Sequence, residues 1–307
     1  MDNVLTFKED IEELHYHMYI PKSYDGSRPY ALYITLPGYG AYYFQGVAVN
    51  LKEEHFAVEA KKYRDEMIIV APQPNDWGEM SKRQTIALTE YMLAAYNIDT
   101  GKVYISGYSG GGETLSLAVS ERPELYTAAL HVSSKWDGEI SRVAEEKTPV
   151  YFAIGEEDEY YGKEPVEKTY KELAALYERE GFNSEEMKEL AVLDIKNEKY
   201  FAGRGVSNQH GGGGLFAEDD AIMGWLFQKE SKTAGGENSK VYTTSSTVRD
   251  VVSNPYFEDF GRLLFPVDRS VSEDMTLEEI SSSSVYIWYS YIDPDKTEEI
   301  PEKNLRW

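Results

Sequence analysis

One stretch decides how this chain is interpreted: VYISGYSGGG, residues 103–112. Residues 103–106 have the β-branched and aromatic character of a buried strand, and residues 113–120 are compatible with a helix. Residues 107–111 between them match the pattern G-x-S-x-G. A sharp strand-to-helix turn of this kind strains its serine, exposes the hydroxyl and needs small neighbours. The pattern predicts that Ser109 is a nucleophile; the alternative is an ordinary glycine-rich turn before a helix.

Apolar runs of strand length recur through the first 230 residues. They occupy residues 30–36, 67–71, 103–106, 128–132, 150–154 and 190–195. Helical patterns lie between them, at residues 84–97, 165–179 and 217–228. This alternation predicts an α/β fold with a mostly parallel central sheet flanked by helices. Reactive groups are then expected in the loops at the carboxyl ends of the strands.

The character of the sequence changes near residue 231. Residues 231–240, SKTAGGENSK, are polar and contain glycine, as is typical of a linker. Residues 241–307 lack the strand–helix alternation but are rich in aromatic side chains. We therefore expect a catalytic domain at 1–230, a linker at 231–240 and an aromatic-rich C-terminal extension at 241–307.

The composition excludes several classes of partner and site. The chain of 307 residues carries 31 Lys and Arg against 54 Asp and Glu, a net charge of −23. Such a surface repels phosphate backbones and anionic lipids, so we expect no nucleic-acid or membrane partner. There is no cysteine, signal-peptide pattern or apolar run of membrane-span length. We expect a cytoplasmic protein, or a secreted one if an export signal has been removed.

A serine nucleophile needs a histidine base, and the histidine needs a carboxylate. Where a serine sits on such a turn, the chain order is Ser, then Asp or Glu, then His. Five histidines are present, and only His131 and His210 follow Ser109. His131 lies inside an apparent strand, where it is expected to be a core residue or to support the site. His210 lies in the loop GVSNQHGGGG, residues 205–214, and is the predicted base.

The orienting carboxylate is expected after the strand at 150–154, in the run GEEDE at residues 155–159. Asp158 suits this role best, with Glu156, Glu157 and Glu159 as rivals. The oxyanion donors are expected to be the amides of Gly110 and Tyr39. Gly110 follows the nucleophile, and Tyr39 lies in the Pro-Gly-Tyr-Gly loop after the strand at 30–36.

Aromatic residues in loops on the same face are candidates for the walls of a substrate pocket, although simple packing is the alternative. These candidates are Tyr39, Tyr42, Tyr43, Trp77 and Trp136.

Three segments resemble bacterial poly(3-hydroxybutyrate) depolymerases, feruloyl esterases and prolyl-oligopeptidase-like hydrolases. They are YIPKSYDG (19–26), LYITLPGYG (32–40) and YNIDTGKVYISGYSGGG (96–112). The likeness covers about residues 14–227. It implies an α/β-hydrolase fold, a catalytic triad of Ser109, Asp158 and His210, and an oxyanion hole at Tyr39 and Gly110. Many of these relatives have His-Gly where this chain has Pro37-Gly38, a version that resembles polyester hydrolases and cutinase-like enzymes.

The C-terminal extension has a likeness of its own. The segments FGRLLFP (260–266), MTL (275–277) and WYS (288–290) resemble the leading segment of another bacterial esterase group, in which it precedes a hydrolase domain. We expect this extension to pack on the first domain or on another subunit, unless the chain is a piece of a tandem enzyme.

These observations predict a serine hydrolase that cleaves small-molecule or polymer-linked carboxylic esters through an acyl-enzyme, without metal or organic cofactor. One alternative is a peptidase of the prolyl-oligopeptidase type, although such peptidases usually carry a propeller domain that nothing before residue 14 could form. The other alternative is a non-catalytic binding protein on a hydrolase scaffold.

Overall fold

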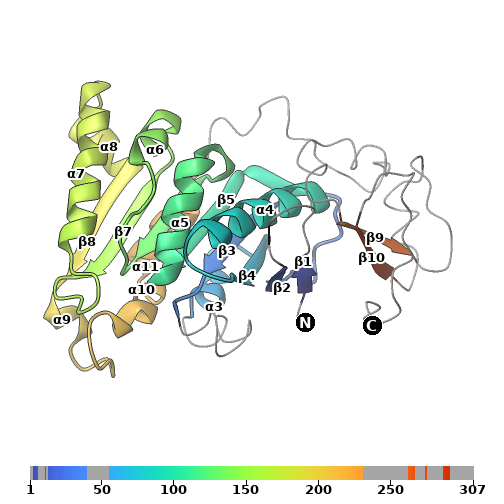
Figure 1. The fold of residues 1–307 in the computed structure, drawn as a ribbon, viewed down its shortest axis with the longest axis horizontal. Helices are drawn as coiled ribbons and strands as arrows, with labels where there is room; N and C mark the ends of the chain where they lie inside the picture. Colours follow the sequence, from blue (N-terminus) through green and yellow to red (C-terminus); the bar gives the residue numbers. More distant parts are fainter. Residues whose placement is uncertain are drawn as a thin grey trace.

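The computed structural model describes residues 3–5, 11, 13–39, 55–230, 262–266, 274 and 286–290. Eight strands form one sheet in the order β1-β2-β4-β3-β5-β6-β7-β8 (Figure 1). Their bounds are β1 Asn3–Leu5, β2 Leu14–Tyr19, β3 Tyr30–Leu36, β4 Met67–Gln73, β5 Ile98–Tyr108, β6 Ala128–Val132, β7 Val150–Gly155 and β8 Ala191–Lys196. From β4 to β8 neighbouring strands run parallel, whereas β1 and β2 add antiparallel pairs at one edge. The prediction of a mostly parallel sheet is confirmed.

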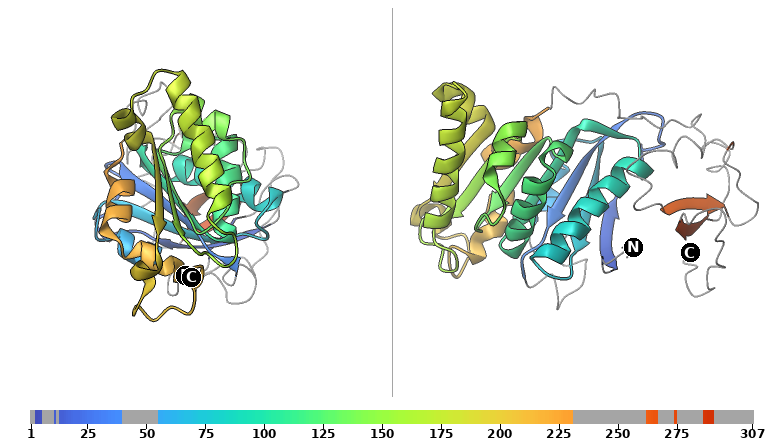
Figure 2. Two further views of the ribbon diagram at one scale, coloured as in Figure 1. Left: turned by 90° about the vertical axis from the view of Figure 1, so that its left-hand side faces the viewer. Right: turned by 45° about the horizontal axis from the view of Figure 1, so that its top comes forward.

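Helices cover both faces of this sheet (Figure 2). The larger helices are α4 Glu79–Ala95, α5 Gly110–Glu121, α6 Ile140–Glu146, α7 Glu164–Arg179 and α11 Asp220–Gln228. The shorter ones are α3 Phe56–Ala60, α8 Ser184–Leu190, α9 Glu198–Phe201, α10 Gly214–Ala217 and the 3₁₀ turns η1 Pro123–Leu125 and η2 Gly211–Gly213. The chain therefore has the layered α/β architecture that its alternating pattern predicts.

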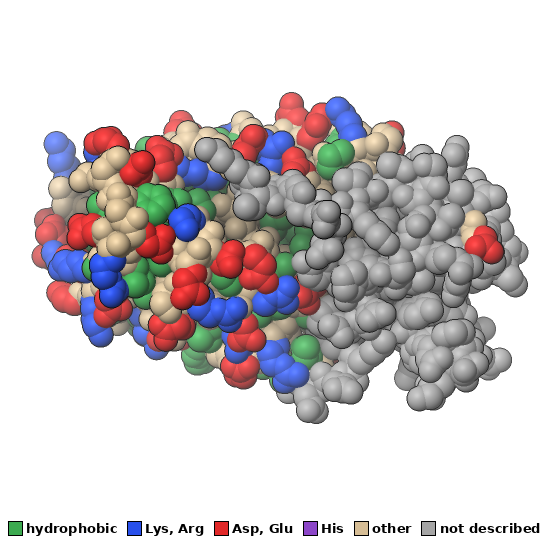
Figure 3. Space-filling model, turned by 90° about the horizontal axis from the view of Figure 1, so that it is seen from above, with side chains coloured by type: hydrophobic (Ala, Val, Ile, Leu, Met, Phe, Trp, Pro, Cys, Tyr) green, Lys and Arg blue, Asp and Glu red, His purple; other side chains and the backbone are tan. Residues whose placement is uncertain are grey.

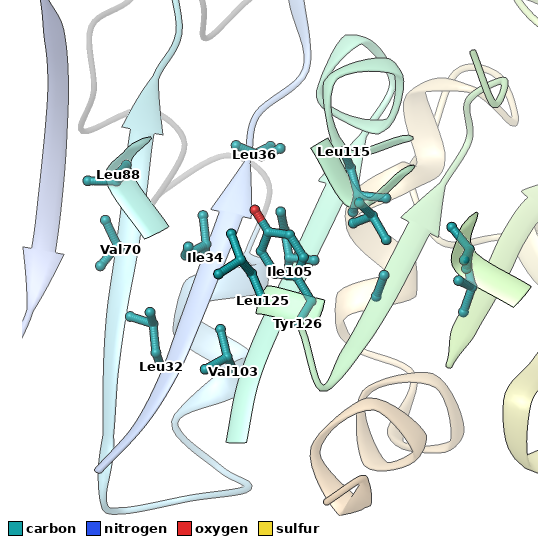
Figure 4. Packing of buried hydrophobic residues seen from close by; sticks show 14 of the residues in the cluster. Leu32, Ile34, Leu36, Val70, Leu88, Val103, Ile105, Leu115, Leu125 and Tyr126 are labelled. Atoms are coloured by element: carbon teal, nitrogen blue, oxygen red, sulfur yellow. The ribbon is translucent and has the colours of Figure 1, made fainter. Parts of the chain in front are cut away.

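Strand alternation divides the apolar side chains between two cores, because successive residues of a strand point to opposite faces. In β3, Leu32 and Ile34 enter the core beneath α4 and α5, whereas Ala31 and Tyr33 enter the core beneath α3 and α11. Figure 4 shows the first core, where Val103 and Ile105 of β5 continue the same layer. Every residue of β3 is buried, which explains its unbroken apolar sequence.

Several boundaries differ from the predicted ones. Strand β5 begins at Ile98, five residues earlier than expected, because it pairs with β3 as far back as Tyr30. The helix predicted at 217–228 corresponds to α11, which starts later, at Asp220, and Ala217 is instead the last residue of the separate helix α10. The break lies at Asp219, whose carboxylate accepts the amide of Ala221 and so caps the start of α11. Strands β1 and β2 were not predicted.

Of the expected C-terminal extension, the structure describes a two-stranded antiparallel sheet of β9 Arg262–Pro266 and β10 Tyr286–Ser290. The predicted linker at 231–240 lies outside the described residues. In the described part of the chain, no helix has the length and apolar character needed to cross a membrane. On the face shown in Figure 3, basic and acidic side chains are interspersed over the described surface.

Candidate active site

The turn between β5 and α5 holds Ser109 in a conformation that few L residues adopt. Its φ is 54° and its ψ is −122°, and it is the residue from which α5 starts. The amide of Ser109 donates to the carbonyl of Val132 on β6 (3.0 Å), and its carbonyl accepts from the amide of Gly112 (2.8 Å) and the hydroxyl of Ser134 (2.7 Å). Tertiary hydrogen bonds on both sides of the serine therefore maintain this strained turn.

Glycines around Ser109 permit close approaches that a side chain would block. A Cβ at Gly107 would lie 2.2 Å from the carbonyl oxygen of Gly111. A Cβ at Gly111 would lie 2.5 Å from the carbonyl oxygen of Leu36 and 2.6 Å from that of Pro37. The end of β3 and the start of its following loop thus lie directly against the first turn of α5.

Three side chains that are far apart in the sequence meet at this turn. Oγ of Ser109 lies 3.1 Å from Nε2 of His210. Nδ1 of His210 lies 3.0 and 3.2 Å from the two carboxylate oxygens of Asp158. A carboxylate can only accept, so Nδ1 carries the proton and Nε2 presents a lone pair to the Ser109 hydroxyl. Ser109 follows β5 and Asp158 follows β7, so both lie at the carboxyl ends of parallel strands, where reactive groups of such sheets gather.

Asp158 is built to remain ionised although its side chain is fully buried. Burial by itself raises the pKa of this carboxyl. The hydrogen bond from His210 and those from the amides of Tyr161 (2.8 Å) and Tyr160 (3.0 Å) outweigh burial and lower the pKa below its ordinary value. A permanently charged acceptor is what a histidine base needs to keep its tautomer.

Aromatic rings and a backbone contact surround His210. The ring of Tyr108 stacks on the imidazole with centroids 5.6 Å apart, and its hydroxyl donates to the His210 carbonyl (2.8 Å). The rings of Tyr160 and Tyr161 lie 5.3 and 5.6 Å from the imidazole. A Cβ at Gly213 would fall 2.0 Å from the Tyr108 ring, so the glycine run after His210 lets this packing form.

A second polar group lies one helical turn from Ser109. Glu113, in the first turn of α5, is buried, and it accepts a 2.7 Å hydrogen bond from the hydroxyl of Tyr161. Nζ of Lys135 lies 3.9 Å from the same carboxylate oxygen and 2.9 Å from Asp137. Burial, together with the bond to Glu113, raises the pKa of Tyr161, although a hydrogen bond with Ser109 opposes the rise. The phenol therefore stays protonated next to the serine.

The expected oxyanion donors, Gly110 and Tyr39, belong to segments that lie against each other. Gly110 is the first residue of α5, immediately after Ser109. Tyr39 follows the Leu36–Pro37 segment that abuts Gly111, and half of its surface is exposed. A helix N-terminus and a neighbouring loop amide are the arrangement that such a site uses to stabilise developing negative charge.

The expected pocket walls have different outcomes. Trp77 and Tyr39 form an exposed edge-to-face pair with ring centroids 5.3 Å apart. Tyr42 and Tyr43 lie outside the described residues. The ring of Trp136 packs on His131 and Phe152, and its indole donates to Ser120. Ser120 is eleven residues along α5 from Ser109, about 16 Å at the helical rise. Trp136 is therefore partly buried against the core and bonded to the end of α5 that is far from Ser109.

The other candidate residues also have clear places. His131 is fully buried in β6, and burial lowers its pKa to about 4, which keeps it neutral. Glu156 pairs with Lys163 (3.1 Å). Glu159 accepts from the backbone amides of Gln209 and His210 instead of from the imidazole. Of the carboxylates at 156–159, Asp158 is the one that the structure brings to the histidine ring.

Sequence reasoning did not single out Tyr161, Glu113 or Gln209, and it named Glu159 only as a rival to Asp158 for the orienting carboxylate. One signal was available, because Tyr160 and Tyr161 directly follow the predicted acid and Glu113 lies four residues after the predicted nucleophile. Polar or aromatic residues that close to a predicted catalytic group can take part in the site. In the described segments, no group of three or more His, Asp and Glu side chains could hold a metal ion.

Comparison with known proteins places the fold in a wider context. The model of the prolyl oligopeptidase family matches residues 73–191. No curated protein sequence matches the chain at a significant level.

Solved structures share the fold at low sequence identity. A thermostable esterase has a TM-score of 0.60 and 22% identity over 75% of this chain, which spans 63% of that esterase. A protein designated FAE has a TM-score of 0.52 and 14% identity over 75% of this chain and 88% of its own. A protein assigned as a dipeptidyl aminopeptidase IV from Bacteroides ovatus has a TM-score of 0.51 and 12% identity, over 75% of this chain and 35% of its own. The chain therefore has the α/β-hydrolase fold.

Proposed function

We propose that this protein is a serine hydrolase that cleaves carboxylic esters through a covalent acyl-enzyme, with Ser109, His210 and Asp158 as its catalytic triad. One observation carries the proposal, the continuous hydrogen-bonded chain from Oγ of Ser109 through the imidazole of His210 to the buried carboxylate of Asp158. A serine hydroxyl is a weak nucleophile until a positioned base takes its proton. This chain of contacts supplies that base in the correct tautomer.

The acylation step follows from these contacts. His210 takes the proton of Ser109 through Nε2 as Oγ attacks the ester carbonyl carbon. The carbonyl oxygen becomes an oxyanion, which in this proposal accepts hydrogen bonds from the amides of Tyr39 and Gly110. His210 then protonates the leaving alcohol, and the C–O bond breaks. Asp158 stabilises the imidazolium that exists between the two proton transfers.

Deacylation repeats the same steps with water. The lone pair of Nε2 deprotonates a water molecule, which attacks the acyl carbon, and the proton returns to Oγ of Ser109 as the acid product leaves. The exposed pair of Tyr39 and Trp77 offers an aromatic surface in the loops that follow β3 and β4. Flat apolar rings suit an acyl or aryl group of the ester.

A peptidase is the second candidate. The match to the prolyl oligopeptidase family model over residues 73–191 favours it, because the same triad can open an amide. The esterase proposal rests in addition on the structural likeness to the thermostable esterase, which has the higher TM-score.

The test compares wild type and Ser109→Ala on 4-nitrophenyl acetate and on a prolyl 4-nitroanilide. We expect ester hydrolysis by wild type and a loss of roughly 10³-fold or more in kcat for Ser109→Ala. Equal ester rates for the two proteins would remove the catalytic proposal and leave a binding protein on a hydrolase scaffold. A kcat/KM for the anilide above that for the ester would favour the peptidase.

A further inference from the structure

Two loops meet at the imidazole of His210, and their backbones are joined as well as their side chains. We name residues 156–162, which follow β7 and carry Asp158, the acid loop. We name residues 202–210, which lead into η2 and end at His210, the base loop. Contacts between Asp158 and His210 join the loops at the catalytic side chains. A second set of contacts joins them at a separate place.

The carboxylate of Glu159 holds the end of the base loop. Its Oε1 accepts from the amide of Gln209 (3.1 Å), and its Oε2 accepts from the amide of His210 (3.0 Å). These amides lie immediately before the short turn η2, where backbone N–H groups lack partners within the turn. A carboxylate has one oxygen for each amide, so Glu159 satisfies both donors from outside the loop.

The base loop makes the reciprocal contact. The side-chain oxygen of Gln209 accepts from the amide of Glu157 in the acid loop (2.8 Å). Gln209 is buried, and a Cβ at Gly155 would lie 2.6 Å from its side-chain oxygen. The glycine at the end of β7 therefore makes room for this side chain. Each loop thus uses one side chain to bind the backbone of the other.

The charge on Glu159 suits this task. Burial acts to raise its pKa, but the hydrogen bonds from the amides of His210 and Gln209 lower it overall. Bonds from neutral amides to a charged acceptor are stronger than those to a neutral acceptor. The two adjacent acidic residues therefore bind different parts of His210. Asp158 contacts its imidazole, and Glu159 accepts a hydrogen bond from its backbone amide.

We propose that Glu159, assisted by Gln209, is a positioning residue that fixes the backbone of the histidine base. This inference rests on the proposed function, since it assigns His210 as the base. The geometric requirement is strict, because a displacement of about 1 Å between reacting groups can cost roughly 10²-fold in rate. Without the Glu159 contacts, the amides of Gln209 and His210 lose their acceptors. The bonds of His210 to Asp158 and Tyr108 remain, but the backbone that carries the imidazole is held less firmly.

The test uses Glu159→Gln, Glu159→Ala and Glu159→Asp, with Glu156→Gln as the matched control. Glutamine offers one acceptor and one NH₂ donor, so one amide of the base loop would face another donor. Glu156 lies in the same acid loop, and Glu156→Gln removes the same charge. The carboxylate of Glu156, however, pairs with Lys163. Glu159 is exposed, so its variants are expected to fold.

Two readouts are measured: the steady-state kinetics with 4-nitrophenyl acetate, and the hydrogen exchange of the Gln209 and His210 amides by NMR. We expect kcat to fall about 10- to 100-fold in Glu159→Gln and Glu159→Ala, with KM within about two-fold of wild type. The two amides should exchange faster in both variants. Glu159→Asp, which keeps both acceptor oxygens, should recover part of kcat, and Glu156→Gln should match wild type.

The results separate a failure of the positioning role of Glu159 from a failure of the proposed function. Wild-type kcat in Glu159→Ala would overturn the positioning role. Equal losses in Glu159→Ala and Glu156→Gln would also overturn it, because loop charge alone would then explain the effect. If wild type is no more active than Ser109→Ala, the proposed function fails. Amide exchange then still tests the Glu159 contacts, and unchanged exchange in Glu159→Ala would refute them. Gln209→Leu, which removes only the reciprocal bond, should give a smaller loss of kcat than Glu159→Ala.

Discussion

The hydroxyl of Tyr161 donates a 2.7 Å hydrogen bond to Oε1 of Glu113 and so joins the acid loop to the first turn of α5. The amide of the same tyrosine donates to Asp158, and its ring lies 5.6 Å from the imidazole of His210. One residue therefore contacts the carriers of the acid, the base and the nucleophile. Because each contact uses a different part of Tyr161, substitutions can separate them.

Tyr161→Phe removes the hydroxyl but keeps the amide and the ring. Glu113 would remain buried without the hydrogen bond from Tyr161 and would keep Lys135 at 3.9 Å. A buried acceptor that loses its donor costs about 1–3 kcal/mol. We expect the free energy of unfolding, measured by urea denaturation, to decrease by about 1–3 kcal/mol relative to wild type. We also expect kcat on 4-nitrophenyl acetate to fall about 10-fold, since the turn at Ser109 loses a tie to the acid loop.

Tyr160→Phe is the matched control, because 73% of Tyr160 is exposed and surface substitutions usually change stability by under about 0.5 kcal/mol. If Tyr160→Phe and Tyr161→Phe give the same stability and the same kcat, the bond to Glu113 has no role.

Asp158→Asn keeps the size of the side chain but removes the charge that fixes the tautomer of His210. We expect kcat at pH 7 to fall by roughly 10³- to 10⁴-fold, because the amide can present its NH₂ group to Nδ1 and leave Nε2 protonated. The comparison is Glu157→Gln, a neighbouring acidic residue in the same loop, which should retain the wild-type rate. If Glu157→Gln lost activity and Asp158→Asn did not, Asp158 would not be the acid of the triad.

Gly111→Ala should impair activity through the backbone beside the proposed oxyanion hole. The added methyl group would lie 2.5 Å from the carbonyl oxygen of Leu36, so the segment that leads to Tyr39 has to move away from Ser109. Losing one oxyanion donor typically costs about 10²- to 10³-fold in kcat. Gly78→Ala, whose Cβ would have its nearest atom at 3.8 Å, should leave kcat unchanged. An active Gly111→Ala variant would mean that Tyr39 is not a donor.

Stability should decrease as the pH falls from about 6.5 to 4 because of His131. Burial lowers the pKa of this histidine to about 4, whereas the unfolded chain has the ordinary value of about 6.5. In that window the unfolded state binds a proton that the folded state does not, so acid favours unfolding by up to about 3 kcal/mol.

Urea denaturation of wild type and His131→Phe at several pH values measures this contribution. Phenylalanine suits the site, where His131 packs on Trp136 and Phe152. The variant should lose less stability than wild type between pH 6.5 and 4, and parallel pH curves would contradict the prediction. Asp158 affects stability at a lower pH than His131 does. Its pKa is lowered by hydrogen bonds that outweigh burial, so its contribution to the free energy of unfolding is present above about pH 4 and is lost only below that pH.

Much of the architecture was predictable because its signals are local. The runs at 30–36 and 128–132 became β3 and β6 with the same bounds, since fully buried parallel strands have continuous apolar sequences. Strand β2, LHYHMY, was missed because it is partly exposed and alternates apolar with polar residues over only six positions. The split at Asp219 was missed because an acidic residue at a helix start also fits a continuous helix with an acidic first turn.

Part of the candidate site was also predictable from local sequence, and part was not. A strand, a G-x-S-x-G turn and a helix lie together in the sequence, so the position of Ser109 and its strained geometry follow from local chemistry. The packing of the acid loop against the base loop decides which side chains reach the imidazole of His210. In the sequence alone, the neighbouring residues Asp158 and Glu159 are equally good candidates. By itself, the sequence determined the layered α/β fold and the serine turn, because backbone conformation and strand burial depend on nearby residues. Only the tertiary structure decided the partners of His210, the place of Trp136 against the core and the link from Tyr161 to Glu113. Those contacts join segments that are brought together only when the sheet has formed.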